Sequence, residues 1–380
     1  MIRKDYLPFG KPNFSDEEIA AVTRVMRSGW VGMGPETIAF EEELAAFLGA
    51  PYVVTVNSCT SALFLSLLVL GVGPGDEVIC PSLTWCTTAN VALHLGAQPI
   101  FCDVDPDTLC VTPELVQEKL TPKTKAVMAV HLAGLAVEVD KIRATLPERV
   151  AIVEDAAHAL GARFADGRSV GSSGNLTCFS FYANKNLSTA EGGAIAVFDE
   201  EVAYRLHSLR QNAMPADAWK RFSHPRSMMY PQLTELGYKM NYTDLQACIG
   251  RIQLNRQPEF HAIRLAVARH YYEHLHTLTP PLRFQSNALY PDHARHLFLI
   301  QLPIEEMSLS RDELLLELRA RNVGASIHYV PLHRMPLYGE QPALPNTERI
   351  CERIMTLPIS ASMNTEDADY VVVQLEELIK

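Results

Sequence analysis

Two apolar runs in the middle of the chain each lead to a charged side chain, and this pattern constrains the fold more than any other feature. The first run, 150–153, leads to Asp155, with His158 three residues further on. The second run, 177–182, is followed by Lys185. Apolar runs of this length are typical of strands in a buried parallel sheet, whose carboxyl ends meet at one edge. We therefore expect the acid and the amine to lie at the same sheet edge.

A carboxylate and a lysine at one sheet edge suit pyridoxal phosphate (PLP). The ring nitrogen of this cofactor must stay protonated to withdraw electrons, which a carboxylate such as Asp155 secures. Its aldehyde forms a Schiff base with a lysine, here Lys185. His158 lies one helical turn beyond the acid and can hydrogen-bond the 3-hydroxyl of the ring, although an isolated histidine there is more often a satisfied core residue. The pattern predicts PLP chemistry.

Composition and charge narrow the class of protein. The 380 residues suffice for one large domain and a smaller one. With 33 basic and 44 acidic residues the net charge is −11, which argues against nucleic acid as a general partner. The N-terminus has no apolar segment typical of a signal peptide, the apolar window 62–70 is too short to span a bilayer, and the eight cysteines form no C-x-x-C pair. We expect a cytoplasmic enzyme without metal or membrane contact.

Strand-length apolar runs alternate with helical patterns from about residue 50 to 200. This alternation predicts the α/β class, with a mainly parallel sheet covered by helices on both faces. The predicted strands are 52–56, 77–80, 98–103, 126–130, 151–154, 177–182 and 194–197, and the predicted helices between the first five are 61–70, 84–95, 113–119 and 139–146.

A second, smaller α/β segment follows. It comprises a helical pattern over 244–276 and then the predicted elements 296–302, 311–321, 325–328 and 366–379. We expect a large cofactor-binding domain at residues 1–250 and a small C-terminal domain at 251–380. The first helix, 16–27 with Ser15 as its N-cap, is expected to pack against the small domain or to cross to it.

Small polar residues follow the first predicted strand. Backbone N–H groups at a helix start, joined by the hydroxyls of Ser58, Thr60 and Ser61, form an anion site. Ordinary helix capping is the commoner interpretation of such residues taken alone. Beside Asp155 and Lys185, a phosphate site is favoured.

Two further residues bear on the chemistry. Trp85 opens a helix just after a predicted strand, where an aromatic ring can stack on a flat cofactor, while a core position is an equally good interpretation. Lys185 must be neutral to act as a base, so we expect a nearby cationic group and partial burial to lower its pKa.

Several motifs in a fixed order resemble the sugar-nucleotide aminotransferases, a PLP-dependent family of DegT/StrS type with the aspartate-aminotransferase fold (fold type I). They are SGWVGMGPETIAFEEELAAFLG, VNSCTSALFLSLLVLGVGPGDEVICPSLTW, VEDAAHALGA, FSFYANKNLSTAEGGAI, LGYKMNYTDLQACIGRIQL and IHYVPLH, which together span nearly the whole chain. PSLTW and EDAAH resemble most the branch that aminates a 4-keto sugar carried on a nucleotide.

The resemblance implies a role for each matching residue. Lys185 would bind the cofactor aldehyde and shuttle the proton, and Asp155 would pair with the ring nitrogen. Trp85 would stack on the ring, and His158 would lie near the 3-hydroxyl. The residues implied at the phosphate are Thr60, Ser61 and Ser180.

The GYKMNY stretch is expected to reach the phosphate of a neighbouring subunit, which implies a homodimer with shared active sites. Many relatives carry asparagine where Lys239 stands and arginine where Asn241 stands, so either residue could meet the phosphate. His328 and His333 are candidate substrate contacts, for which a core or loop position is an equally good interpretation.

The resemblance implies a two-stage transamination. L-glutamate would give its amino group to the cofactor, which would pass it to a keto-sugar linked to a nucleotide diphosphate, making an amino sugar for cell-surface polysaccharide or secondary metabolism. One alternative is a PLP-dependent sugar dehydratase, but such relatives replace the lysine by histidine. Another is a non-enzymatic ligand-sensing or DNA-binding regulator, for which the chain lacks a basic helix-turn-helix pattern. The sugar, the ring carbon and the nucleotide stay open.

Overall fold

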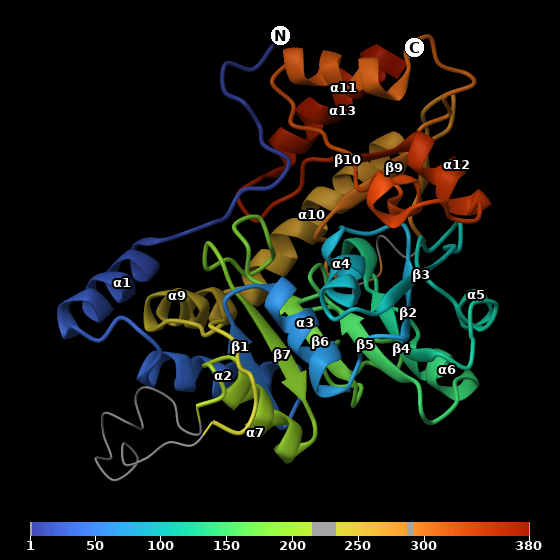
Figure 1. Cartoon of the computed structure of the whole chain (residues 1–380). Helices are drawn as coiled ribbons and strands as arrows, with labels where there is room; N and C mark the ends of the chain where they lie inside the picture. The colour runs from blue at the N-terminus through green and yellow to red at the C-terminus, as the bar shows by residue number, and fades with distance from the viewer. Residues whose placement is uncertain (1, 215–232, 287–289, 291, 380) are drawn as a thin grey trace.

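The computed structural model describes residues 2–214, 233–286, 290 and 292–379, and a seven-stranded sheet lies at its centre (Figure 1). The strand order is β1-β7-β6-β5-β4-β2-β3. The strands are β1 (Tyr52–Val56), β2 (Glu77–Pro81), β3 (Gln98–Cys102), β4 (Thr124–Val130), β5 (Ala151–Asp155), β6 (Leu176–Ser180) and β7 (Gly193–Val197). Neighbouring strands from β3 to β6 pair in parallel, and β7 is antiparallel to both of its neighbours. The predicted mainly parallel sheet is confirmed.

Helices cover both faces of this sheet because successive side chains of a strand point to opposite sides. Along β1, Val53 belongs to one apolar layer and Val54 to the other. The first layer packs on α2 (Pro35–Leu48), α5 (Pro113–Gln117), α6 (Val139–Thr145) and α9 (Asp244–Asn255). The second packs on α3 (Cys59–Val69), α4 (Thr87–His94) and α7 (Glu200–Leu209).

The C-terminal part has its own small sheet and core. Its elements are α10 (Gln257–Leu275), β8 (Arg283–Phe284), β9 (Phe298–Gln301), α11 (Arg311–Ala320), α12 (Pro345–Arg353), β10 (Ile354–Leu357) and α13 (Thr365–Ile379), with antiparallel strands in the order β10-β9-β8. Val267, Ile300 and Val371 belong to its core. Figure 1 shows both chain termini beside α11 and α13. Among the described residues, no helix is long and apolar enough to cross a membrane.

Three details of the predicted elements are wrong. The single helical pattern over 244–276 is two helices, α9 and α10, and Pro258 stands in the first turn of the second, where its missing N–H is tolerated. No strand forms over 325–328, where Ser326 makes only an isolated bridge to Thr356. Helices α2 and α7 form although their segments were not predicted as helices.

The first helix, α1 (Asp16–Ser28), begins with a capping box in which Ser15 and Glu18 satisfy each other's backbone N–H groups. Its apolar residues Ala21 and Val25 pack on Cys248 of α9. The segment before the helix is the part that crosses to the small domain, since Leu7 joins the small core. The helix therefore packs on α9, and the expected domain boundary at residue 250 lies inside that same helix.

Candidate active site

Three neighbouring parallel strands end at one cavity. Val130, Asp155 and Ser180 end β4, β5 and β6, and all three line a cavity of about 360 Å³. This volume lies within the range of about 300–1,000 Å³ typical of small-molecule sites. Lys185, from the loop after β6, lines the same cavity. The acid and the amine predicted to share a sheet edge therefore do so.

Two hydrogen bonds hold the carboxylate of Asp155. The Oγ1 hydroxyl of Thr88, on α4, donates to Oδ2 at 2.7 Å, and the backbone N–H of Ala157 donates to Oδ1 at 3.2 Å. Asp155 is 6% exposed, so its side chain has little freedom to turn away. The carboxylate is thus fixed in orientation at the cavity wall.

Burial lowers the pKa of Lys185 to about 8, while the Cys59 thiol and the Asp155 carboxylate act in the opposite direction. The lowered pKa and the partial burial were expected. The expected cationic neighbour is wrong, because desolvation alone lowers this pKa and the neighbouring charges raise it. At pH 7 about one lysine in ten is neutral, far more than for an exposed lysine.

His296 contacts the amine directly and was missed by the sequence analysis. Its Nε2 lies 3.4 Å from Lys185 Nζ, and its Nδ1 lies 3.3 Å from the amide oxygen of Asn186. The Asn186 amide nitrogen donates to the carbonyl of Ala294 at 2.8 Å, which assigns Oδ1 as the acceptor toward His296. The imidazole therefore carries its proton on Nδ1 and turns an Nε2 lone pair to the lysine. The one sequence feature that pointed to His296 was its position at the start of the predicted strand 296–302.

His158 lines the cavity as a neutral imidazole. Burial lowers its pKa well below the usual range, and the charges of Lys185 and His328 add to the effect. Its Nδ1 accepts from the backbone N–H of Ala133 at 3.3 Å, and its Nε2 lies 3.1 Å from the hydroxyl of Tyr329. Tyr329 is a second cavity residue that the sequence analysis missed.

The start of α3 forms a polar pocket at another part of the cavity. Ser58 caps the helix by accepting from the backbone N–H of Ser61 at 3.2 Å. Thr60 and Ser180 line the cavity, whereas the Ser61 hydroxyl donates to Asn57 at 2.6 Å and does not belong to the lining.

Gly193 allows this turn to approach β7. A Cβ on Gly193 would lie 2.6 Å from the carbonyl carbon of Ser58 and 2.7 Å from the backbone nitrogen of Cys59. Because backbone atoms cannot yield as a side chain can, any larger residue would displace the helix start from the cavity.

The remaining predicted residues separate into two groups. Trp85 and His328 line the cavity; Trp85 is 60% exposed, and its ring centroid lies 6.0 Å from that of Tyr329. Burial, with the charge of Lys185, lowers the pKa of His328 to about 4. His333 lies outside the lining, and its ring nitrogens are engaged by Ser82 at 2.7 Å and by Glu348 at 3.0 Å.

Lys239 and Asn241 also lie outside the lining of the cavity in their own chain. The Lys239 ammonium donates to the Asn241 side-chain oxygen, and the Asn241 amide nitrogen donates to the carbonyl of Tyr242 at 2.9 Å. The two side chains thus form one polar pair.

These groups fit the three contacts that PLP requires. An oriented carboxylate suits the protonated ring nitrogen, an amine with a lowered pKa suits the aldehyde, and the first turn of α3 with its hydroxyls suits the phosphate. Because Gly193 has no side chain, β7 packs closely against that turn and the backbone of the turn stays at the cavity. The residues present therefore fit the cofactor.

Comparison with known proteins agrees with this geometry. The model of the DegT/DnrJ/EryC1/StrS aminotransferase family matches residues 12–376. The chain belongs to this family. It is 38% identical over 388 residues to the spore coat polysaccharide biosynthesis protein SpsC of Bacillus subtilis (strain 168), an alignment that covers 100% of this chain and 98% of SpsC.

Solved structures of aminotransferases resemble this DegT/StrS-type chain along its whole length. TlmJ from Streptoalloteichus hindustanus is 35% identical, with a TM-score of 0.89 and 98% of both chains covered. A putative sugar aminotransferase from Streptococcus pneumoniae in its PMP form is 30% identical, with a TM-score of 0.90 and 98% of both chains covered. The predicted family, fold, cofactor and enzyme class are confirmed: this is a PLP-dependent aminotransferase.

Proposed function

We propose that this aminotransferase moves the amino group of L-glutamate onto a keto-sugar linked to a nucleotide diphosphate, with 4-keto sugars favoured. The main support for this proposal is that one cavity holds both Lys185, whose pKa is about 8, and the oriented carboxylate of Asp155. A sugar acceptor is supported by the names of two relatives, the putative sugar aminotransferase of S. pneumoniae and the spore coat polysaccharide biosynthesis protein SpsC. The product would be an amino sugar for cell-surface polysaccharide or secondary metabolism, made in the cytoplasm.

Each side chain has a defined task in this proposal. When bound, PLP supplies an electron-withdrawing ring and a carbon that carries the amino group. Asp155 holds a proton on the ring nitrogen, and Thr88 keeps its carboxylate in place. Lys185 would take the proton from the substrate carbon at Nζ and return it to the cofactor carbon on the other side of the transferred nitrogen. His158, neutral at physiological pH, would lie beside the 3-hydroxyl of the ring, and Trp85 would cover one ring face.

A panel assay tests the acceptor. The purified enzyme, loaded with PLP, is mixed with L-glutamate and with UDP-, dTDP- and GDP-linked 3-keto or 4-keto sugars, and 2-oxoglutarate is measured. We expect turnover with a 4-keto sugar to exceed turnover with its 3-keto isomer. Lys185→Ala should lose both turnover and the lysine-dependent absorbance of the bound cofactor. Absence of 2-oxoglutarate with every acceptor would contradict the proposal.

We further propose a homodimer in which Lys239 or Asn241 completes the phosphate site of the partner subunit. The proposal is supported by the position of both side chains outside the cavity of their own chain. Co-expression of a Lys185→Ala chain with a Lys239→Ala/Asn241→Ala chain tests it. Because half of the dimers would be mixed, each with one intact site, about a quarter of the wild-type activity should return. Activity that stays at the level of the two parent variants would contradict shared sites.

A further inference from the structure

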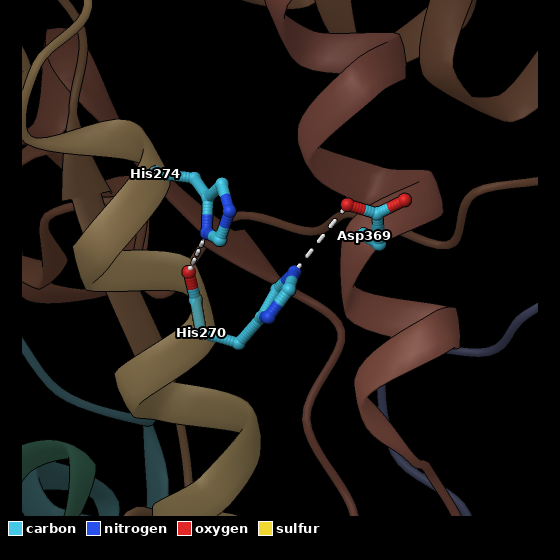
Figure 2. A group of neighbouring side chains, drawn as sticks. All are labelled: His270, His274 and Asp369. Carbon is cyan, nitrogen blue, oxygen red and sulfur yellow. Dashed lines mark hydrogen bonds and ion pairs between the residues drawn. The ribbon is translucent and has the colours of Figure 1, made fainter.

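A second group of polar side chains lies on the small domain, outside the lining of the active-site cavity. It consists of His270 and His274 on α10 and Asp369 on α13, and Figure 2 shows the three side chains gathered in the space between these helices. One nitrogen or oxygen of each side chain lies within 4.8 Å of those of the other two. Residues four apart share one face of a helix, and the two imidazole centroids are 4.3 Å apart.

The hydrogen bond of His274 prepares it to bind a metal ion. Its Nδ1 lies 2.8 Å from the backbone carbonyl of His270, which can only accept, so Nδ1 carries the proton. The lone pair then lies on Nε2. Histidine ligands of metal ions commonly have this arrangement, in which the other ring N–H is bound by a carbonyl or carboxylate that fixes the ring.

His270 supplies the second nitrogen. Its Nε2 is buried and makes no hydrogen bond to any described residue, while the Asp369 carboxylate lies 3.5 Å away. A buried polar atom without a hydrogen bond destabilises the fold, so this nitrogen favours a ligand. The i, i+4 pair resembles in spacing the two histidines that bind zinc from one face of a helix.

We propose that His270, His274 and Asp369 bind one divalent transition-metal ion of the Zn²⁺ class, with water at the remaining position. Tetrahedral zinc bonds of about 2.0–2.1 Å place ligand atoms roughly 3.3 Å apart, close to the 3.5 Å between His270 and Asp369. The Asp369 side chain is 60% exposed and His274 is exposed, so both can move the remaining distance. Two imidazoles and a carboxylate suit zinc better than calcium or magnesium.

The ion would join α13, the last helix of the chain, to the end of α10. Both helices already pack in the core of the small domain. The expected effect of the metal is therefore stabilisation of this domain rather than chemistry. The inference is independent of the proposed sugar substrate.

The test uses the full-length, PLP-loaded enzyme without an affinity tag, after removal of metal by a chelator. Zn²⁺ is titrated by calorimetry, and thermal unfolding is followed with and without saturating Zn²⁺. We expect one Zn²⁺ per chain and a rise in Tm of roughly 2–4 °C. His274→Gln and Asp369→Asn should each weaken binding about tenfold or more and remove the rise in Tm.

His276 provides a matched control on the same helix end. It is exposed, and its Nδ1 lies 2.8 Å from the carbonyl of Tyr272, in the same spacing as His274 and His270, but it does not belong to the three-residue group. His276→Gln should leave Zn²⁺ affinity unchanged. Equal affinity in wild-type protein and His274→Gln, or the absence of saturable Zn²⁺ binding, would overturn the proposal.

Discussion

Glu154 and Asp155 are consecutive buried carboxylates on β5, and they face opposite sides of the sheet. Glu154 lies 2.9 Å from His131 Nε2 and accepts hydrogen bonds from Ser173 and Asn175. Burial alone would raise the pKa of Glu154, but His131 and these hydrogen bonds outweigh it and lower the pKa.

Asp155 has fewer protein partners, with one hydroxyl and one backbone N–H on its two oxygens. A carboxylate can accept about four hydrogen bonds. Asp155, on the cavity side of β5, can therefore accept further hydrogen bonds from a ligand. The hydrogen bonds of Glu154, on the opposite side of the sheet, are made within the protein. The difference separates a carboxylate that can serve a ligand from one that holds the fold together.

After the loss of Lys185 itself, the largest expected effect comes from Asp155→Asn. An amide cannot keep a proton on the ring nitrogen, so kcat should fall by about 100- to 10,000-fold. The melting temperature should change little because the amide fills the same space, its oxygen can accept from Ala157, and its nitrogen can donate to the Thr88 hydroxyl. Measurement of kcat and of thermal unfolding on one preparation checks both points, and full activity would refute the role of Asp155.

Capture of PLP by the apoenzyme should depend on pH through Lys185. Only the neutral amine attacks the aldehyde, so the rate should rise about tenfold between pH 7 and pH 9 and level off above its pKa of about 8. Burial lowers the pKa values of His158, His296 and His328 below 6.5, so these groups stay neutral in this range. Stopped-flow absorbance gives the profile; a rate still rising steeply at pH 10 would contradict the lowered pKa.

Replacement of His296 tests its hydrogen bond to the amine. His296→Leu removes the Nε2 acceptor, which should slow cofactor capture about fivefold, the equivalent of one ordinary hydrogen bond. His296→Gln retains an acceptor oxygen and should recover most of the rate. A purely structural role would predict the same loss for both variants, together with an unaltered pH profile.

Glu154→Gln should have the smallest effect on turnover. The amide turns one acceptor into a donor inside the far-side network, which should lower the free energy of unfolding by about 1–3 kcal/mol. We expect kcat to stay within about twofold of wild type because the cavity is unchanged. Urea unfolding and steady-state assays check this; a loss of kcat as large as that of Asp155→Asn would remove the distinction between the two sides.

The sequence predicted the parts of the site that depend on local order. Asp155 and Lys185 follow apolar runs, and strand ends in a parallel sheet meet at one edge, so their proximity follows from the pattern. His296 lies 111 residues from Lys185 in the chain, and only the packing of the small domain brings it there. His328 and His333 belong to one motif, and only tertiary packing decides that the first lines the cavity while the second is buried between Ser82 and Glu348.

Lys185 lies in a loop, and the antiparallel direction of β7 explains why its position is nevertheless well defined. Ser180 at the end of β6 pairs with Gly193 at the start of β7, so residues 181–192 leave and re-enter the sheet side by side. A parallel β7 would instead need a long crossover to the opposite edge. Both ends of the short loop that carries the lysine are therefore fixed by paired strands. An insertion of a few residues into this loop would make the position of the lysine less well defined, although every side chain of the cavity would be unchanged.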